Sequence, residues 1–163
     1  MLSPEIIIKE TKKIRQLLDN NKHRKIALIS QDFPVTSCKL ASIILAYHLT
    51  KLSPTTIVYG ISGIAKDLKN ENNISHYWLE VQGLALDITS DQYNLISDHE
   101  LNVSIIKSRP FPSVSIAKID EQLNYKLFKI SNIDTYFYGW PELAEDFLEM
   151  LETSYELLTA KNK

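Results

Sequence analysis

The sequence contains little cysteine and little arginine, and it has no long apolar run. The single cysteine, Cys38, excludes an internal disulfide and any zinc or iron–sulfur centre that needs several cysteines. Only 3 of the 18 basic residues are arginine and the formal net charge is −2, so a nucleic-acid partner is not expected. No apolar run approaches the roughly 20 residues that span a bilayer, so no membrane association is expected either.

Patterns that would indicate a metal or a cofactor are also missing. The acidic residues show no spacing to histidine that is typical of a metal site. Gly60 and Gly63 do not form a phosphate-binding loop. We therefore expect neither a metal nor another cofactor.

The length and composition are those of one globular domain. A chain of 163 residues is long enough to bury a core, and 44% hydrophobic with 23% charged residues is ordinary for a globular protein. The first ten residues do not resemble a signal peptide, because the short run Ile6–Ile8 stands beside acidic residues. We expect a single domain over residues 1–163, located in the cytoplasm.

Local patterns predict an α+β fold. Ser3 and Pro4 start a helix that ends near Asn21, and Pro141 starts a long C-terminal helix. The segment from Cys38 to about Leu52 is apolar nearly all round, which is typical of a helix buried in the middle of its domain. Strands are predicted over residues 25–30, 55–61, 76–82, 84–89, 103–107 and 125–130, with a short helix and loop over 63–73.

Two of these strands form a hairpin that brings a histidine and an aspartate together. If Gln82-Gly83 is a two-residue turn, Val81 faces Leu84 and Glu80 faces Ala85. Side chains alternate along a strand, so His76 and Asp87 then project from the same side as diagonal neighbours. A shift of one residue in the register would place them on opposite faces.

Each of the three candidate reactive residues also has a structural interpretation. Cys38 lies in the first turn of a helix, where free N–H groups favour a thiolate and can hold an oxyanion, although a lone cysteine is more often a small buried hydrophobic residue. His76 taken alone is expected to be a surface histidine at the end of a strand. Asp87 between Leu86 and Ile88 is costly to bury unless it is paired, which makes it the most informative of the three.

The order of these motifs resembles the transglutaminase-like superfamily of papain-fold cysteine enzymes. The resemblance is carried by S-C-K-L-A-S at 37–42, H-Y-W-L-E-V at 76–81 and L-D-I-T at 86–89, and it covers about residues 30–90. It implies a papain-like core, in which the buried helix bearing the cysteine packs on an antiparallel sheet. It also implies a triad of Cys38 as nucleophile, His76 as general base and Asp87 as orienting acid. Small bacterial members that release leader peptides from lasso precursors are similar in size.

The resemblance is incomplete around the cysteine. Many members have a tryptophan or glycine near it, whereas this chain has Val35, Thr36 and Ser37. In papain-like relatives a glutamine shortly before the cysteine assists the oxyanion, and Gln31 is the candidate here. Elsewhere, His48 points away from Cys38 because ten helical residues turn about 280°. The aromatic run 136–140 is either part of a substrate groove or part of the core.

Together these features predict thiol-dependent hydrolysis or acyl transfer at an amide bond of a peptide or protein. The other interpretation is a non-catalytic papain-like module that binds a protein partner through the same groove. The sequence does not choose between peptidase, deamidase, transglutaminase and acyltransferase, since all share an acyl-enzyme. It does not name the substrate or the oligomeric state.

Overall fold

The computed structural model describes residues 1–21, 24–66 and 74–160, and within these ranges the chain forms an α+β fold around one antiparallel sheet. The sheet has five strands in the order β4-β3-β2-β1-β5. The elements follow along the chain as α1 (Pro4–Asn21), α2 (Cys38–Leu52), β1 (Val58–Ala65), β2 (Ser75–Val81), β3 (Leu84–Asp87), η1 (Ser90–Asn94), η2 (Asp98–Glu100), α3 (Val103–Lys107), β4 (Ser115–Lys118), η3 (Ile119–Glu121), α4 (Asn124–Leu127), β5 (Phe128–Tyr136) and α5 (Glu145–Thr159).

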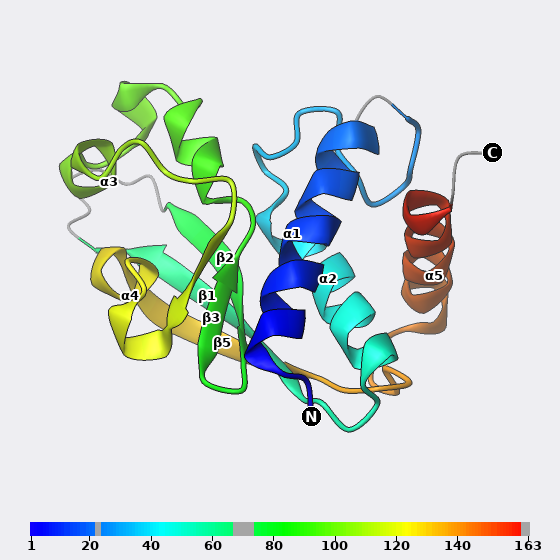
Figure 1. Cartoon of the computed structure of the whole chain (residues 1–163). Coiled ribbons are helices and arrows are strands. Elements are labelled where there is room, and N and C mark those ends of the chain that lie inside the picture. The colour runs from blue at the N-terminus through cyan, green and yellow to red at the C-terminus, as the bar shows by residue number, and fades with distance from the viewer. Residues whose placement is uncertain (22–23, 67–73, 161–163) are drawn as a thin grey trace.

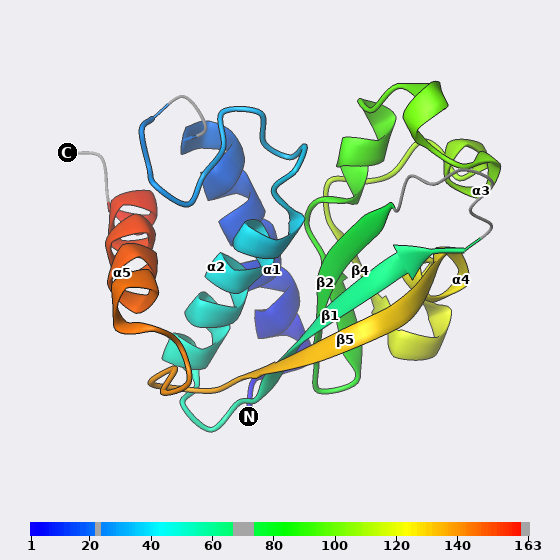
Figure 2. The same ribbon diagram turned by 180° about the vertical axis from the view of Figure 1, so that it is seen from behind.

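The helices lie in two groups on either side of the sheet. Figure 1 shows α1, α2 and α5 on one side and the shorter helices α3 and α4 on the other, and Figure 2 shows the same arrangement from behind. None of the helices among the described residues is long and apolar enough to cross a membrane.

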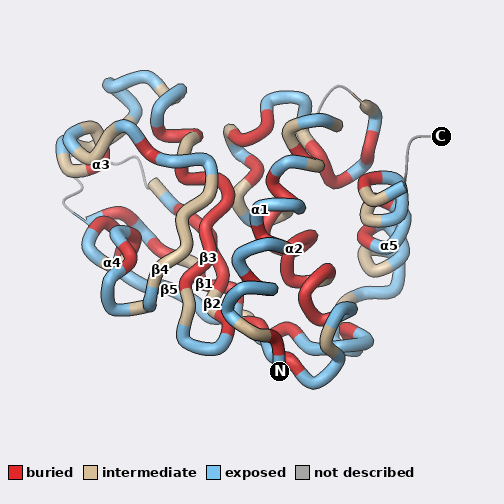
Figure 3. Tube along the Cα trace, viewed as in Figure 1, coloured by how far each residue is buried: buried red, intermediate tan, exposed pale blue. Residues whose placement is uncertain are grey.

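Helix α2 is the centre of the larger core. Its residues Ile44, Leu45 and Leu49 are completely buried, as predicted from an apolar pattern without a polar face. Burying each such side chain contributes about 1.5–3 kcal/mol. The predicted bounds of this helix, Cys38 to Leu52, are confirmed. Figure 3 shows that most of α2 is buried, and the helix packs against β2 and β1.

A second, aromatic core fills the opposite face of the sheet. Trp78 and Phe128 are fully buried there, together with Tyr93. Gly63 allows the close approach of β1, because a Cβ atom at this position would lie 2.8 Å from the Phe128 Cβ and 2.9 Å from the Trp78 ring. The two cores place strands β2 and β3 in the middle of the molecule, where both faces are covered.

The hairpin between β2 and β3 has the predicted register. Val81 pairs with Leu84 and Glu80 pairs with Ala85. The turn residues have positive φ, 49° at Gln82 and 82° at Gly83, as a tight primed turn requires. Glycine adopts this conformation without cost, so the Gln82-Gly83 pair fixes the register that sets the orientation of the strand ends.

Two predicted strands are wrong. Residues 25–30 form an irregular segment with one turn, in which Ile29 N–H donates to the Ile26 carbonyl at 3.0 Å. Ile26, Leu28 and Ile29 are buried although the segment does not join the sheet. Residues 103–107 form helix α3, because the Asn102 side chain caps it by accepting a hydrogen bond of 2.9 Å from Ile105 N–H. A cap and tertiary packing outweigh the β propensity of short apolar runs.

Several other boundaries differ from the prediction, and β3, for example, ends at Asp87 instead of Thr89. Strand β1 begins at Val58 and includes residues 63–65, and residues 67–73 of the predicted helix and loop lie outside the described residues. The segment predicted as a strand over 125–130 divides into α4 and the start of β5. Helix α5 begins at Glu145 instead of Pro141, after a turn in which Trp140 has a φ of 48°.

Candidate active site

Asp87, at the end of β3, receives hydrogen bonds from several surrounding groups. Its Oδ2 accepts hydrogen bonds from His76 Nε2 at 2.6 Å, from Asn124 Nδ2 at 2.7 Å and from the Ser90 hydroxyl. Its Oδ1 accepts one from Thr89 N–H at 2.9 Å. The residue is only 1% exposed, so these donors replace the water that a buried carboxylate loses.

His76, on β2, is held between Asp87 and aromatic rings. The imidazole is 1% exposed, and its centroid lies 5.2 Å from that of Tyr93 and 5.3 Å from that of Phe128. The in-plane direction of Nε2 is taken by Asp87, which leaves Nδ1 for other contacts. The predicted hydrogen bond between the histidine and the aspartate of the hairpin is therefore present.

Cys38 is the first residue of α2 and lies against this imidazole. Its side chain is half-buried, and its proximity contributes to the raised pKa of His76. Because Asp87 occupies Nε2, Nδ1 is the ring nitrogen that remains for Cys38. The structure thus brings Cys38, His76 and Asp87 together at the start of a helix and on two adjacent strands.

The start of α2 also offers free backbone donors. The first helical hydrogen bond at this end runs from Ala41 N–H to the Ser37 carbonyl at 2.9 Å, so the N–H groups of Cys38, Lys39 and Leu40 precede the helical ladder. Ser37 makes no side-chain cap. These N–H groups carry the positive end of the helix dipole and suit an oxygen that becomes negative beside the thiol.

The electrostatics favour an ion pair between His76 and Asp87. Burial alone lowers the pKa of His76, but the charge and hydrogen bond of Asp87, with a smaller contribution from Cys38, outweigh it and raise the pKa to about 10. Burial likewise raises the pKa of Asp87, but the charge of His76 and the hydrogen bonds from His76, Ser90 and Asn124 lower it to about 2. An imidazolium facing an ionised carboxylate follows.

Two glutamines are candidates for holding an oxyanion. Gln31, the predicted one, lies exposed in the turn segment 31–36, and its role stays a prediction. Gln92, in η1, is 5% exposed, and its Nε2 lies 3.4 Å from His76 Nδ1. The sequence pattern did not single out Gln92. Its side chain is buried beside the imidazole because η1 folds back immediately after β3.

Arg15 of α1 fixes the segment that follows Asp87. Its guanidinium binds both carboxylate oxygens of Asp91 at 2.7 Å and donates to the carbonyl oxygens of Ile88 at 2.7 Å and Ser113 at 3.0 Å. Two parallel bonds to one carboxylate define its orientation as well as its position. Arg15 therefore joins the N-terminal helix to the polypeptide between Asp87 and Gln92.

His48, as predicted, points away from Cys38. Its ring bridges Glu10 Oε2 of α1 at 2.6 Å and the Tyr155 hydroxyl of α5 at 2.7 Å. Burial lowers the pKa of His48, although the hydrogen bond and charge of Glu10 act in the opposite direction. Among residues 1–21, 24–66 and 74–160, no cluster of three potential metal ligands is found.

Comparison of the chain with protein-family models, with curated proteins and with solved structures gives no match.

Proposed function

We propose that the protein is a cysteine enzyme that hydrolyses, or transfers the acyl group of, an amide bond in a peptide or protein. The observation that carries this proposal is the contact of one buried imidazole with two partners. His76 Nε2 binds Asp87 at 2.6 Å, and Cys38 lies close enough to contribute to the raised pKa of the same ring. This proximity supports the roles of Cys38 as nucleophile, His76 as base and Asp87 as orienting acid.

The first half of the reaction forms an acyl-enzyme. His76 already carries the proton, so Cys38 reacts as a thiolate. Its sulfur attacks the substrate carbonyl carbon, a C–S bond forms, and the electron pair of the C=O bond moves to the oxygen, which becomes an oxyanion. The N–H groups at the start of α2 hold this oxygen. His76 then gives its proton to the leaving nitrogen as the C–N bond breaks, and the amine departs.

The second half releases the acyl group. Water or an amine enters, His76 takes its proton, and the new C–O or C–N bond forms as the C–S bond breaks. The sulfur leaves as a thiolate beside the protonated His76, which restores the starting state. Water gives hydrolysis and an amine gives acyl transfer, so the acceptor decides which of the two reactions occurs.

Asp87 acts throughout as an ionised acceptor. Its hydrogen bond fixes the His76 tautomer and stabilises the imidazolium. Ser90, Asn124 and the Thr89 N–H keep the carboxylate in place and charged. Gln92 supports the same centre as a second oxyanion donor, because its amide nitrogen lies beside Nδ1.

The proposal includes a papain-like, transglutaminase-like core and a cytoplasmic location. It is supported by the cysteine at the start of a buried helix and by the histidine and aspartate on adjacent antiparallel strands, in the order that the resemblance implies. The lone cysteine agrees with a reducing compartment.

Alkylation of the native protein tests the proposal. Iodoacetamide at pH 6 should modify Cys38 faster than a model thiol, because the adjacent imidazolium stabilises the thiolate. The His76→Ala variant should react at the rate of the model thiol, and the Cys38→Ala variant should take up no label. A Cys38 that reacts only after unfolding would instead be a buried core residue or part of a non-catalytic binding module.

A further inference from the structure

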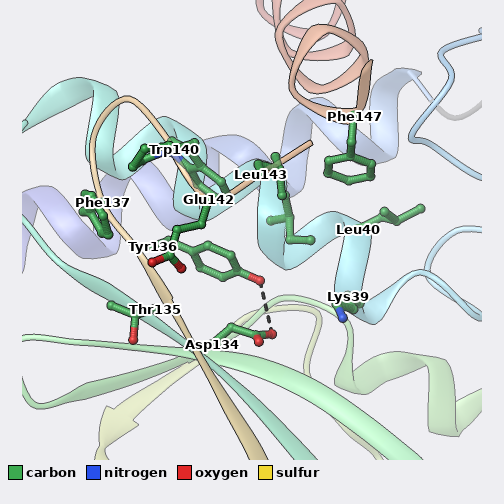
Figure 4. Close-up of a pocket in the computed structure, with 12 residues that line it drawn as sticks. Lys39, Leu40, Asp134, Thr135, Tyr136, Phe137, Trp140, Glu142, Leu143 and Phe147 are labelled. Carbon is green, nitrogen blue, oxygen red and sulfur yellow. Dashed lines mark hydrogen bonds between the residues drawn. The ribbon is translucent and has the colours of Figure 1, made fainter. Parts of the chain in front are cut away.

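A pocket of about 390 Å³ opens directly beside the helix that carries Cys38. It lies between the first turns of α2, the end of β5, the segment 137–144 and the start of α5 (Figure 4). Its volume is in the range of sites that hold small ligands or single side chains. The mechanism proposed above does not use it.

The pocket lies next to the candidate active site, close to both α2, which carries Cys38, and β2, which carries His76. Lys39 and Leu40, which line it, follow Cys38 in the sequence. The Lys39 ammonium lies 5.6 Å from the ring centroid of Tyr77, the residue after His76. Neighbouring Cα atoms are 3.8 Å apart and an extended residue spans about 3.3–3.6 Å. A peptide whose amide bond lies at Cys38 therefore reaches the pocket within one to three residues.

The walls of the pocket are mainly apolar and are contributed by both the helices and the sheet. Figure 4 shows Leu143 and Phe147 on the side of α5, with Leu40 of α2 beside them and Tyr136 of β5 opposite. Trp140 stacks on Tyr136 with centroids 4.5 Å apart, and its indole N–H donates to the Thr50 hydroxyl at 3.1 Å. These contacts fix the aromatic wall before any ligand arrives.

The carboxylate at the floor of the pocket is already occupied by internal donors. Asp134 Oδ2 accepts hydrogen bonds from the Tyr77 hydroxyl at 2.8 Å and the Tyr136 hydroxyl at 3.4 Å, and its Oδ1 accepts one from Asn132 at 3.1 Å. Gly60 makes room for this cluster, because a Cβ atom there would lie 1.8 Å from the Tyr77 hydroxyl oxygen. The floor is therefore a closed polar network and does not need a polar ligand.

We propose that this pocket binds an apolar side chain of the peptide substrate, of the size of leucine or phenylalanine, within three residues of the reacting amide bond. This inference rests on the proposed function. An apolar side chain loses no hydrogen bonds on entry, whereas a charged one is desolvated against Leu40, Leu143 and Phe147. An acidic side chain also meets Asp134 and Glu142, whose two negative charges outnumber the positive charge of Lys39 in the lining.

Peptidyl vinyl sulfones test this assignment, since they report on Cys38 and on the pocket together. A series of tripeptide probes carries leucine, phenylalanine, glycine or aspartate at each of the three positions in turn, with alanine elsewhere. At one position, leucine and phenylalanine should label Cys38 at least tenfold faster than glycine, and aspartate should be slowest. Equal rates for all four residues at every position would overturn the pocket assignment.

Two substitutions locate the effect. Leu143→Trp fills the pocket and should reduce the leucine-to-glycine rate ratio at least fivefold. Phe147→Ala enlarges it and should move the preference from leucine to a larger aromatic residue, which keeps the test valid should the tryptophan variant not fold. The control Leu157→Trp changes an exposed residue elsewhere on α5 and should keep the wild-type ratio. An unchanged ratio in both pocket variants would overturn the proposal.

Iodoacetamide distinguishes a failure of the pocket assignment from a failure of the proposed function, because it is too small to need the pocket. If iodoacetamide labels Cys38 in a His76-dependent way while the probes show no side-chain preference, the pocket assignment fails and the proposed function stands. If neither reagent labels Cys38 in the native protein, both fail.

Discussion

The side chain of Asn124 donates a hydrogen bond of 2.7 Å to the same Asp87 oxygen that receives the His76 imidazole. Asn124 lies in the short helix before β5, 37 residues beyond Asp87 in the sequence. The carboxylate is thus positioned from outside its own hairpin. The candidate active site includes the far side of the sheet as well as the helix that carries the thiol.

Asp87→Asn is expected to abolish most activity and leave the fold intact. The amide keeps the shape of the carboxylate but no longer holds the correct imidazole tautomer, so turnover should fall about 10²–10⁴-fold. Asp87→Ala should in addition cost about 1–3 kcal/mol in the free energy of unfolding, because His76 loses its buried partner. Probe labelling and urea unfolding measure the two effects, and exposed Asp120→Asn is the matched control. Wild-type labelling in Asp87→Asn would show that the triad is misassigned.

Asn124→Ala tests the positioning of that carboxylate. Removing one donor from a buried, charged acceptor should destabilise the protein by about 1–3 kcal/mol. Labelling of Cys38 should slow, but less than in Asp87→Asn, since the His76–Asp87 bond remains. The pH at which labelling is half-maximal should also shift, which a purely structural role for Asn124 does not predict. Exposed Asn20→Ala, at the end of α1, serves as the control for loss of an amide.

The His76–Asp87 pair predicts how stability depends on pH. The pKa of His76 is raised from 6.5 to about 10, so the folded state binds a proton more tightly than the unfolded state. The stabilisation is fully present below pH 6.5 and is lost as pH rises toward 10. Urea unfolding of Cys38→Ala, in which Asp87 is the remaining charged partner of His76, should show the same decline as the pH rises above 6.5. Adding Asp87→Asn should flatten it, and parallel curves would contradict the ion pair.

Arg15→Ala is expected to be strongly destabilising. Leaving Asp91 and the Ile88 carbonyl without their guanidinium should cost about 3–5 kcal/mol in the free energy of unfolding. Arg15→Lys should recover only part of this, because an ammonium does not reproduce the two parallel bonds. A double-mutant cycle with Asp91→Asn isolates the pair, and exposed Lys12→Ala is the control. Additive effects would show that the contact contributes little.

Local patterns were sufficient for α2 and for the hairpin that carries His76 and Asp87. The apolar pattern of the helix and the Gln82-Gly83 turn can both be recognised within a few residues. Once the turn fixes the register, the alternation of side chains along the strands places His76 and Asp87 on the same face. They failed for residues 25–30 and 103–107, where short apolar runs fit a strand or a turn equally well. There the choice was made by contacts with the rest of the fold and by the Asn102 cap.

The supporting residues of the candidate site were not detectable in the sequence. Asn124 and Gln92 are ordinary polar residues in polar stretches, and nothing in their spacing relates them to Asp87 or His76. Their roles follow from where α4 and η1 pack against the sheet, which is a property of the whole fold. The aromatic run 136–140 had two interpretations, and the structure supports elements of both: Tyr136 and Trp140 are buried and also line the pocket.

Cys38 belongs to the helical layer, whereas His76 and Asp87 belong to the sheet. The geometry of the candidate site therefore depends on the packing of α2 against β2, to which buried residues such as Ile44 and Leu79 contribute. A transient separation of the two layers would move Cys38 away from His76 while the helix and the strands stay folded. The rate at which Cys38 is alkylated therefore reports how stably the helical layer packs against the sheet.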